Sequence, residues 1–165
     1  MIFVTVGTHE QQFDRLIEYM DEYSIQHMDE EVVIQTGFST YVPKHATWSK
    51  LYPYEEMLEL VDRARIVITH GGPSSFIMPL QRGKIPIVVP RRHEFNEHVN
   101  NHQVSFSRAV AKRQKNIIEV EDVKKLGKII GNYENLVEKI TNGLESNNEK
   151  FCKEFAKIVN GLVER

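Results

Sequence analysis

The sequence predicts an α/β domain built on a parallel sheet that is covered by helices on both faces. Short runs rich in valine and isoleucine alternate along the chain with longer segments whose apolar residues recur at helical spacing. A glycine-rich turn, THGGPSS at residues 69–75, joins one of these apolar runs to a helical segment. Alternating strands and helices favour a parallel sheet, because each crossover needs a helix to return the chain to the same edge.

Length and composition agree with one domain over residues 1–165. A chain of 165 residues can bury a core, and its net charge of −2 gives no reason to expect a nucleic-acid partner. The single cysteine, Cys152, cannot form an internal disulfide, which favours a reducing compartment. No basic region precedes the apolar start and Gly7 ends it early, so we expect a strand there rather than a signal peptide. A run of about 18 apolar residues that would span a membrane is also lacking.

The first half of the chain contains three predicted strands. They are expected at 2–6, 32–36 and 47–52, and glycines stop the first two. Apolar residues at helical spacing predict a helix over about 11–23. Pro53 is expected to begin a second helix, whose apolar face includes Met57 and Val61.

The second half predicts strands at 65–69, 85–90 and 116–120, with helices from 76 to near Gly83 and over about 96–112. From residue 121 the spacing is helical, and it includes a final amphipathic stripe from Phe151 to Leu162. We expect the helices of 121–165 to pack on this domain or on a partner. A Rossmann-like sheet of this kind binds ligands at the carboxyl ends of its strands, where turns 7–12, 70–75 and 91–97 would meet.

The turn at 70–75 has the composition of a phosphate-binding turn. Gly71 and Gly72 would let the backbone approach a ligand closely, and Ser74 or Ser75 could cap the next helix and donate a hydroxyl to a phosphate. An ordinary strand-to-helix turn with a capping serine explains the same residues equally well. The turn is neither a Walker loop, nor a dinucleotide fingerprint, nor a nucleophile elbow.

Three other segments carry candidate binding groups. Turn 7–12 could meet an anion at the start of the next helix, or it could be a solvated capping turn. Arg91 and Arg92 could clamp a diphosphate with bidentate hydrogen bonds, although exposed arginines are more often merely solvated. The NNHQ run at 100–103 could hold ribose hydroxyls or a base edge, or it could be an ordinary polar helix surface.

The histidines do not predict a metal site. His93 and His98 are five residues apart, so their imidazoles would not share a helix face. His98 and His102 are four apart and could share one, but no third ligand lies at a convincing spacing.

Three segments in the same order resemble the donor-binding half of GT-B glycosyltransferases of family 28. These segments are THGGPSS at 69–75, GKIPIVVP at 83–90 and EHVNNHQ at 97–103, and FVTVGT at 3–8 and FDRL at 13–16 add to the likeness. The resemblance covers roughly residues 2–120. It is strongest to small stand-alone subunits that work with a separate membrane-associated protein.

The resemblance implies a role for each matching position. Gly7 and Thr8 would lie at the diphosphate or at the inter-subunit cleft. A diphosphate turn would contain His70, Gly71, Gly72, Ser74 and Ser75, and the sugar or ribose would lie near Asn101, His102 and Gln103. Many relatives carry a glycine at position 74 and a ribose-binding glutamate at position 78, where this chain has Ser74 and Met78. A methionine cannot accept those hydrogen bonds.

The resemblance also implies a function. The chain would be the UDP-sugar-binding catalytic subunit of a two-component inverting glycosyltransferase, independent of metal and cofactor. It would transfer a hexose, with galactose favoured, to a lipid-diphosphate-linked saccharide in bacterial capsule or exopolysaccharide synthesis. A membrane-associated partner would bind the acceptor at the cytoplasmic face of the plasma membrane. The general base would come from the partner, or from His9 in this chain.

Three alternatives stay open at this stage. The chain could be a non-catalytic subunit that binds and stabilises a partner, or it could belong to an N-acetylglucosaminyltransferase. A nucleotide-sugar epimerase of related architecture would need a cofactor fingerprint or a paired acid and base, and neither stands out in the sequence.

Overall fold

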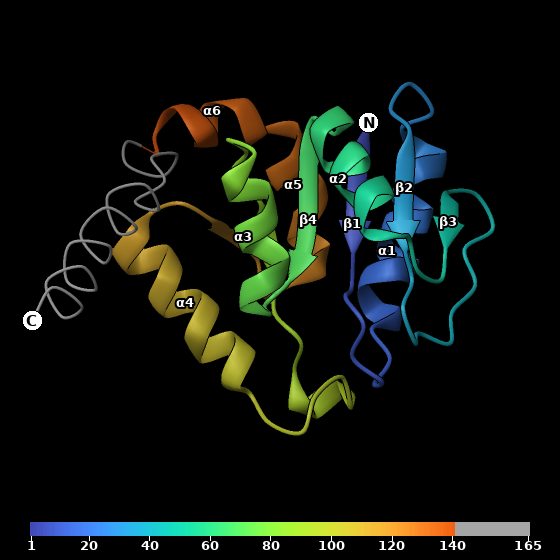
Figure 1. Cartoon of the computed structure of the whole chain (residues 1–165), viewed down its shortest axis with the longest axis horizontal. Helices are drawn as coiled ribbons and strands as arrows, with labels where there is room; N and C mark the ends of the chain where they lie inside the picture. Colours follow the sequence, from blue (N-terminus) through green and yellow to red (C-terminus); the bar gives the residue numbers. More distant parts are fainter. Residues whose placement is uncertain (141–165) are drawn as a thin grey trace, which may run out of the picture.

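A six-stranded parallel sheet forms the centre of the computed structural model, which describes residues 1–140 (Figure 1). The strand order is β3-β2-β1-β4-β5-β6, and every neighbouring pair is parallel. The strands are β1 (Ile2–Thr5), β2 (Val32–Gln35), β3 (Thr47–Ser49), β4 (Ile66–His70), β5 (Ile87–Val89) and β6 (Ile118–Glu119). The predicted fold class is therefore confirmed.

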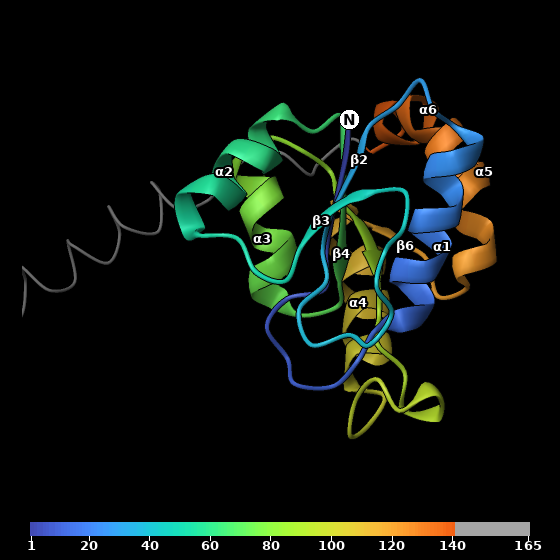
Figure 2. The same cartoon turned by 90° about the vertical axis from the view of Figure 1, so that its right-hand side faces the viewer.

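Helices cover both faces of the sheet (Figure 2). One face carries α1 (Asp14–Gln26), α5 (Leu126–Gly131) and α6 (Tyr133–Glu138). The other carries α2 (Tyr54–Arg63), α3 (Pro73–Gln81) and α4 (His102–Gln114). Two short 3-10 turns, η1 (His93–Phe95) and η2 (Val123–Lys125), complete the described chain. None of the helices within residues 1–140 is long and apolar enough to cross a membrane.

The strands are apolar throughout because both of their faces are buried. Along β1, Ile2 and Val4 pack in the cluster beneath α1, whereas Phe3 packs in the cluster beneath α2. The same alternation places Ile68 on the first face and Val67 on the second. Two separate cores thus fix the position of β1 and β4 at the centre of the sheet.

Several predicted boundaries are wrong by a few residues. Helix α1 begins at Asp14 rather than 11, and β3 ends at Ser49 rather than 52. The largest error concerns α4, which begins at His102 rather than 96. Residues 93–95 form η1 instead, and Asn96, with a φ of 56°, ends that turn. The predicted amphipathic helix over 151–162 lies outside the described residues.

The order of the strands creates a crevice beside β1 and β4. The chain leaves β1 for α1 on one face and leaves β4 for α3 on the other face. The loops after these two neighbouring strands therefore diverge, and ligands bind at such a topological switch point in open α/β sheets.

Candidate functional site

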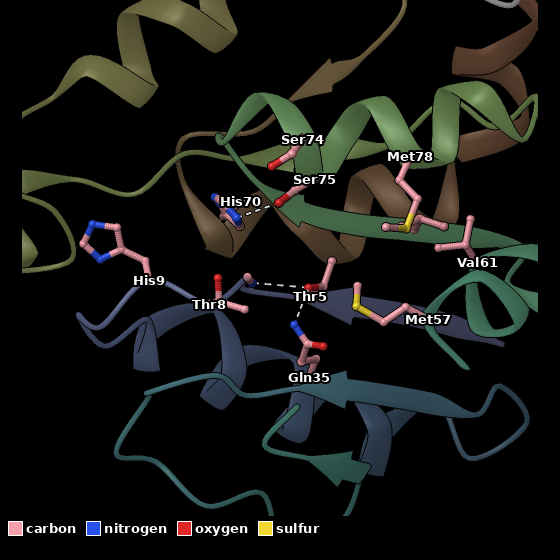
Figure 3. A pocket seen from close by; sticks show the side chains of 12 residues that line it. Thr5, Thr8, His9, Gln35, Met57, Val61, His70, Ser74, Ser75 and Met78 are labelled. Carbon is pink, nitrogen blue, oxygen red and sulfur yellow. Dashed lines mark hydrogen bonds between the residues drawn. The ribbon is translucent and has the colours of Figure 1, made fainter. Parts of the chain in front are cut away.

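A cavity of about 380 Å³ opens at the carboxyl ends of β1 and β4 (Figure 3). Six of the predicted site residues line it, and they come from the loop after β1 and from the end of β4 and the start of α3. The lining consists of Thr5, Gly7, Thr8, His9, Gln35, Met57, Val61, Val67, His70, Ser74, Ser75 and Met78. The structure thus brings the first two predicted turns together at one cavity.

Helix α3 begins directly after the two glycines. Gly72 is the N-cap residue, no side chain caps the helix, and Pro73 occupies the first turn, where its missing N–H costs nothing. The prediction that Ser74 or Ser75 caps this helix is therefore wrong. Both serines instead lie in the first turn of α3 and line the cavity, at the positive end of the helix dipole.

The imidazole of His70 organises this turn. Its Nδ1 accepts the backbone N–H of Gly72 at 2.9 Å, and its Nε2 lies 2.6 Å from the hydroxyl oxygen of Ser75. Because Nδ1 is an acceptor, the proton of the neutral ring is on Nε2, and it is donated to Ser75. The hydroxyl proton of Ser75 is then left to donate to an acceptor in the cavity.

His70 stays neutral over the physiological range. Burial, and to a lesser extent the positive charge of Arg91, lower its pKa to about 3. The ring therefore acts as a fixed hydrogen-bond donor at this site and not as a group that titrates near pH 7.

Two glycines pack directly on the same ring. A Cβ atom at Gly7 would overlap Nε2 of His70, and one at Gly72 would overlap its Cε1. Gly7 also has a φ of +72°, which side chains other than glycine rarely adopt. The loops after β1 and β4 are thereby both held against one imidazole.

A second pair of histidines lies at the same edge of the sheet. The rings of His9 and His98 are 5.0 Å apart between centroids. Nδ1 of His9 accepts the N–H of Gln11, and Nδ1 of His98 accepts that of Asn100. Burial, then Arg91 and His98, lower the pKa of His9. His9 lines the cavity whereas His98 does not, and a role of His9 as general base stays a prediction.

Asn101, His102 and Gln103 do not line this cavity, and each has a different role in the structure. Gln103 is buried, and its Oε1 accepts the N–H groups of Gly71 and Arg91, both at 3.1 Å. Asn101 is exposed and accepts the N–H of His93, and His102 stacks on a neighbouring phenylalanine. Gln103 therefore braces the glycine turn, and the expected sugar contacts of the three residues stay a prediction.

The expected diphosphate clamp by Arg91 is wrong. Its side chain is fully buried, and its guanidinium donates to the backbone carbonyls of Val6, Gln11, Gln12 and Glu97. These bonds direct its donors into the protein rather than into the cavity. An arginine after a strand resembles a solvated residue in sequence, since nothing local reveals the carbonyls that surround it.

Sequence reasoning also missed the polar floor of the cavity and the part of its apolar wall that α2 provides, whereas Met78 was expected at the donor site. Thr5 and Gln35 end two strands, and the amide of Gln35 donates to the Thr5 hydroxyl at 3.1 Å. Met57 and Val61 of α2 and Met78 of α3 form the wall. A polar residue that ends an apolar strand, such as Thr5 or Gln35, was the signal available in the sequence.

Within residues 1–140, no three histidine, cysteine, aspartate or glutamate side chains gather as a metal site would require. His98 lies against His9, and His102 lies against Phe106, so the two do not converge on a common ligand position.

The profile of the glycosyltransferase family 28 C-terminal domain matches residues 1–162. The chain belongs to this family. The resemblance inferred from three short segments is thereby confirmed over almost the whole length.

Two curated relatives of this family 28 domain carry the same name. The chain is 32% identical over 122 residues to the UDP-N-acetylglucosamine transferase subunit ALG13 of Homo sapiens. It is 31% identical over 124 residues to the subunit of that name from Mus musculus. Each match covers 67% of this chain and 10% of the relative, so the chain spans about a tenth of the length of these proteins.

Solved structures share the fold of this family 28 domain at low identity. The glycotransferase of kitacinnamycin has a TM-score of 0.63 at 16% identity, covering 84% of this chain and 37% of that one. CalG4, the calicheamicin glycosyltransferase, has a TM-score of 0.56 at 12% identity, covering 84% of this chain and 36% of that one. The domain therefore has the fold of one part of such GT-B enzymes.

Proposed function

We propose that this domain binds the UDP-sugar donor of a glycosyltransferase in the cavity between β1 and β4. The observation that carries the proposal is the turn of residues 70–75, which presents the first turn of α3 and the Ser75 hydroxyl to that cavity in a family 28 domain. Backbone amides at a helix N-terminus favour an anion such as a diphosphate. Gly7 and Thr8 would meet the same group from the loop after β1.

The reaction that fits this arrangement is an inverting displacement. The oxygen of an acceptor hydroxyl attacks the anomeric carbon, the bond from that carbon to the diphosphate oxygen breaks, and UDP leaves with the electron pair. The helix dipole of α3 and the Ser75 hydroxyl would stabilise the charge that grows on UDP. No metal or cofactor enters this proposal. The acceptor proton passes to a base, either His9 or a group of the partner.

We further propose that the chain works with a membrane-associated partner. Support comes from the two ALG13 relatives, each of which is named as a transferase subunit. In this proposal the partner binds a lipid-diphosphate-linked saccharide, and both proteins act at the cytoplasmic face of the plasma membrane. Of the C-terminal residues 121–165, the described part up to residue 140 packs on the domain itself through η2, α5 and α6.

The sugar is proposed to be a hexose, for which two candidates have support. The EHVNNHQ run favours galactose transfer in bacterial capsule or exopolysaccharide synthesis. The names of the two relatives favour N-acetylglucosamine. Calorimetric titration of the full chain with UDP, UDP-galactose, UDP-glucuronate and UDP-N-acetylglucosamine tests the proposal. Binding of UDP with a preference for one UDP-sugar is expected, and no binding of any of the four would reject it.

A transfer assay separates a catalytic subunit from a stabilising one. The chain is incubated with the preferred UDP-sugar and the lipid acceptor, with and without the partner. A Gly72→Ala or Ser75→Ala chain that still supports full transfer by the complex would show that this cavity is not the donor site.

A further inference from the structure

Arg91 is a buried cation without a direct counter-ion. Its guanidinium donates to four main-chain carbonyls, and within residues 1–140 no carboxylate lies within the 4.0 Å of an ion pair. Glu97 lies nearby, but its two oxygens accept from Arg15 at 2.8 and 2.9 Å and from the N–H of Arg92. The Nε of Arg91 is buried and has no hydrogen-bond partner in the described chain.

Such a charge costs free energy in the empty protein. A buried ion is tolerated when an opposite charge and hydrogen bonds compensate its lost hydration. Burial lowers the pKa of Arg91 to about 10, against the raising effect of Glu97, so the guanidinium stays charged at pH 7. Carbonyl groups bond its two terminal nitrogens but leave Nε without a partner and its net charge in place. A ligand carrying negative charge would complete the compensation.

The position of Arg91 connects it to both loops of the cavity. Its guanidinium bonds the carbonyl of Val6, the residue directly after β1, and those of Gln11 and Gln12 further along the same loop. Its backbone N–H shares Gln103 Oε1 with the N–H of Gly71 in the glycine turn. Its charge also lowers the pKa of both His9 and His70, two residues that line the cavity. The positive field of the guanidinium therefore reaches the place where the two turns meet.

We propose that Arg91 is a positioning residue that supplies a fixed positive charge to the anionic donor without touching it. The proposal rests on the proposed UDP-sugar site. The charge is held in place before the ligand arrives, so no reorganisation is needed when negative charge grows on the departing UDP. Because it is buried, salt screens it less than a surface arginine.

The test compares UDP, which is an anion, with uridine, the neutral nucleoside that lacks the diphosphate. Affinities for UDP and for uridine are measured by calorimetry on the full-length wild type, Arg91→Met, Arg91→Lys and the control Arg65→Met. Arg65 precedes β4 at the opposite edge of the sheet and pairs there with Glu30. Only folded variants, judged by thermal melting, are compared.

For Arg91→Met, the ratio of UDP affinity to uridine affinity should fall about tenfold, the effect of removing one positive charge near the anion at intermediate dielectric. Arg91→Lys should have a lower melting temperature, but its ratio of UDP to uridine affinity should stay close to that of the wild type. In Arg65→Met the ratio should be unchanged. A ratio unchanged in Arg91→Met, or lost equally in the Met and Lys variants, overturns the proposal and leaves UDP binding intact. Absence of UDP binding by the wild type overturns the proposed function together with this inference.

A measurement on the wild type does not depend on variant folding. UDP should shift the nitrogen-15 resonance of the Arg91 Nε–H group, whereas uridine at saturation should leave it in place. A resonance that both ligands move equally, or that neither moves, contradicts an electrostatic role.

Discussion

His70 and Ser75 form a directed hydrogen bond in which the imidazole donates and the hydroxyl accepts, with 2.6 Å between Nε2 and Oγ. The direction follows from Gly72, whose N–H occupies the other ring nitrogen. A residue five positions earlier in the chain therefore decides where the Ser75 proton can point.

Ser75→Ala should weaken UDP binding about tenfold or more, because a hydrogen bond to a charged group contributes about 1.5–3 kcal/mol. The fold should persist, since the hydroxyl packs at the edge of the cavity rather than in the core. Calorimetry measures the change, and Ser105→Ala is the matched control on α4, outside the cavity lining. Equal affinities of the two variants would mean that the hydroxyl does not face the ligand.

Gly7→Ala and Gly83→Ala should differ in binding although both replace a glycine of positive φ. The φ angles are +72° and +71°, so each alanine carries a similar backbone strain of about 1–2 kcal/mol. At Gly83 nothing lies within 4 Å of the new Cβ, whereas at Gly7 it would overlap His70. UDP binding should be lost in Gly7→Ala and preserved in Gly83→Ala. If calorimetry shows that both variants lose UDP affinity to a similar extent, backbone strain alone explains the loss.

Acid should destabilise the domain through His70. Its pKa is about 3 in the folded chain and about 6.5 when unfolded, so below pH 6.5 the unfolded state binds more protons. The contribution of His70 to the free energy of unfolding is fully present above pH 6.5. It falls as the pH drops towards 3, and at pH 5 about 2 kcal/mol of it is lost. Urea unfolding at pH 7 and pH 5 measures this loss. His70→Gln should be less stable at pH 7 but should lose less between the two values, and parallel losses would refute the assignment.

Met78→Glu should change how the domain recognises ribose, because the family resemblance places the ribose at this position. The wild-type wall of Met57 and Met78 accepts no hydrogen bonds, so UDP and 2′,3′-dideoxy-UDP should bind within about threefold of each other. The carboxylate of Met78→Glu should favour UDP, whereas Met57→Glu on α2 should not. Strong discrimination by the wild type would point instead to the polar floor of Thr5 and Gln35.

The sequence was sufficient for the sheet and for the glycine turn, because both depend on local signals. Val67 and Ile68 belong to an apolar run that is buried on both faces, and Gly71 and Gly72 stop that run. The start of α4 was missed because Asn96 adopts a left-handed conformation, which a helical spacing of apolar residues does not reveal. Local periodicity thus predicts the elements better than their ends.

Roles that depend on distant partners could not be predicted. Arg91 has the sequence context of a surface arginine, but its four acceptors belong to the segment that follows β1, at residues 6–12, and to Glu97. Gln103 was expected beside a sugar, and the bonds from two backbone N–H groups to its oxygen were not predicted. In both cases the residue type predicts that the side chain forms hydrogen bonds, but the partners depend on the fold.

The bond from Gly71 to Gln103 means that the glycine turn cannot be transplanted alone. The amide oxygen that holds it comes from a helix 32 residues further along the chain, and the same oxygen holds Arg91, the second residue after β5. Grafting HGGPSS into another parallel sheet would reproduce the sequence of the turn but not its backbone conformation. A designer who wishes to reuse this turn must carry the first turn of α4 with it.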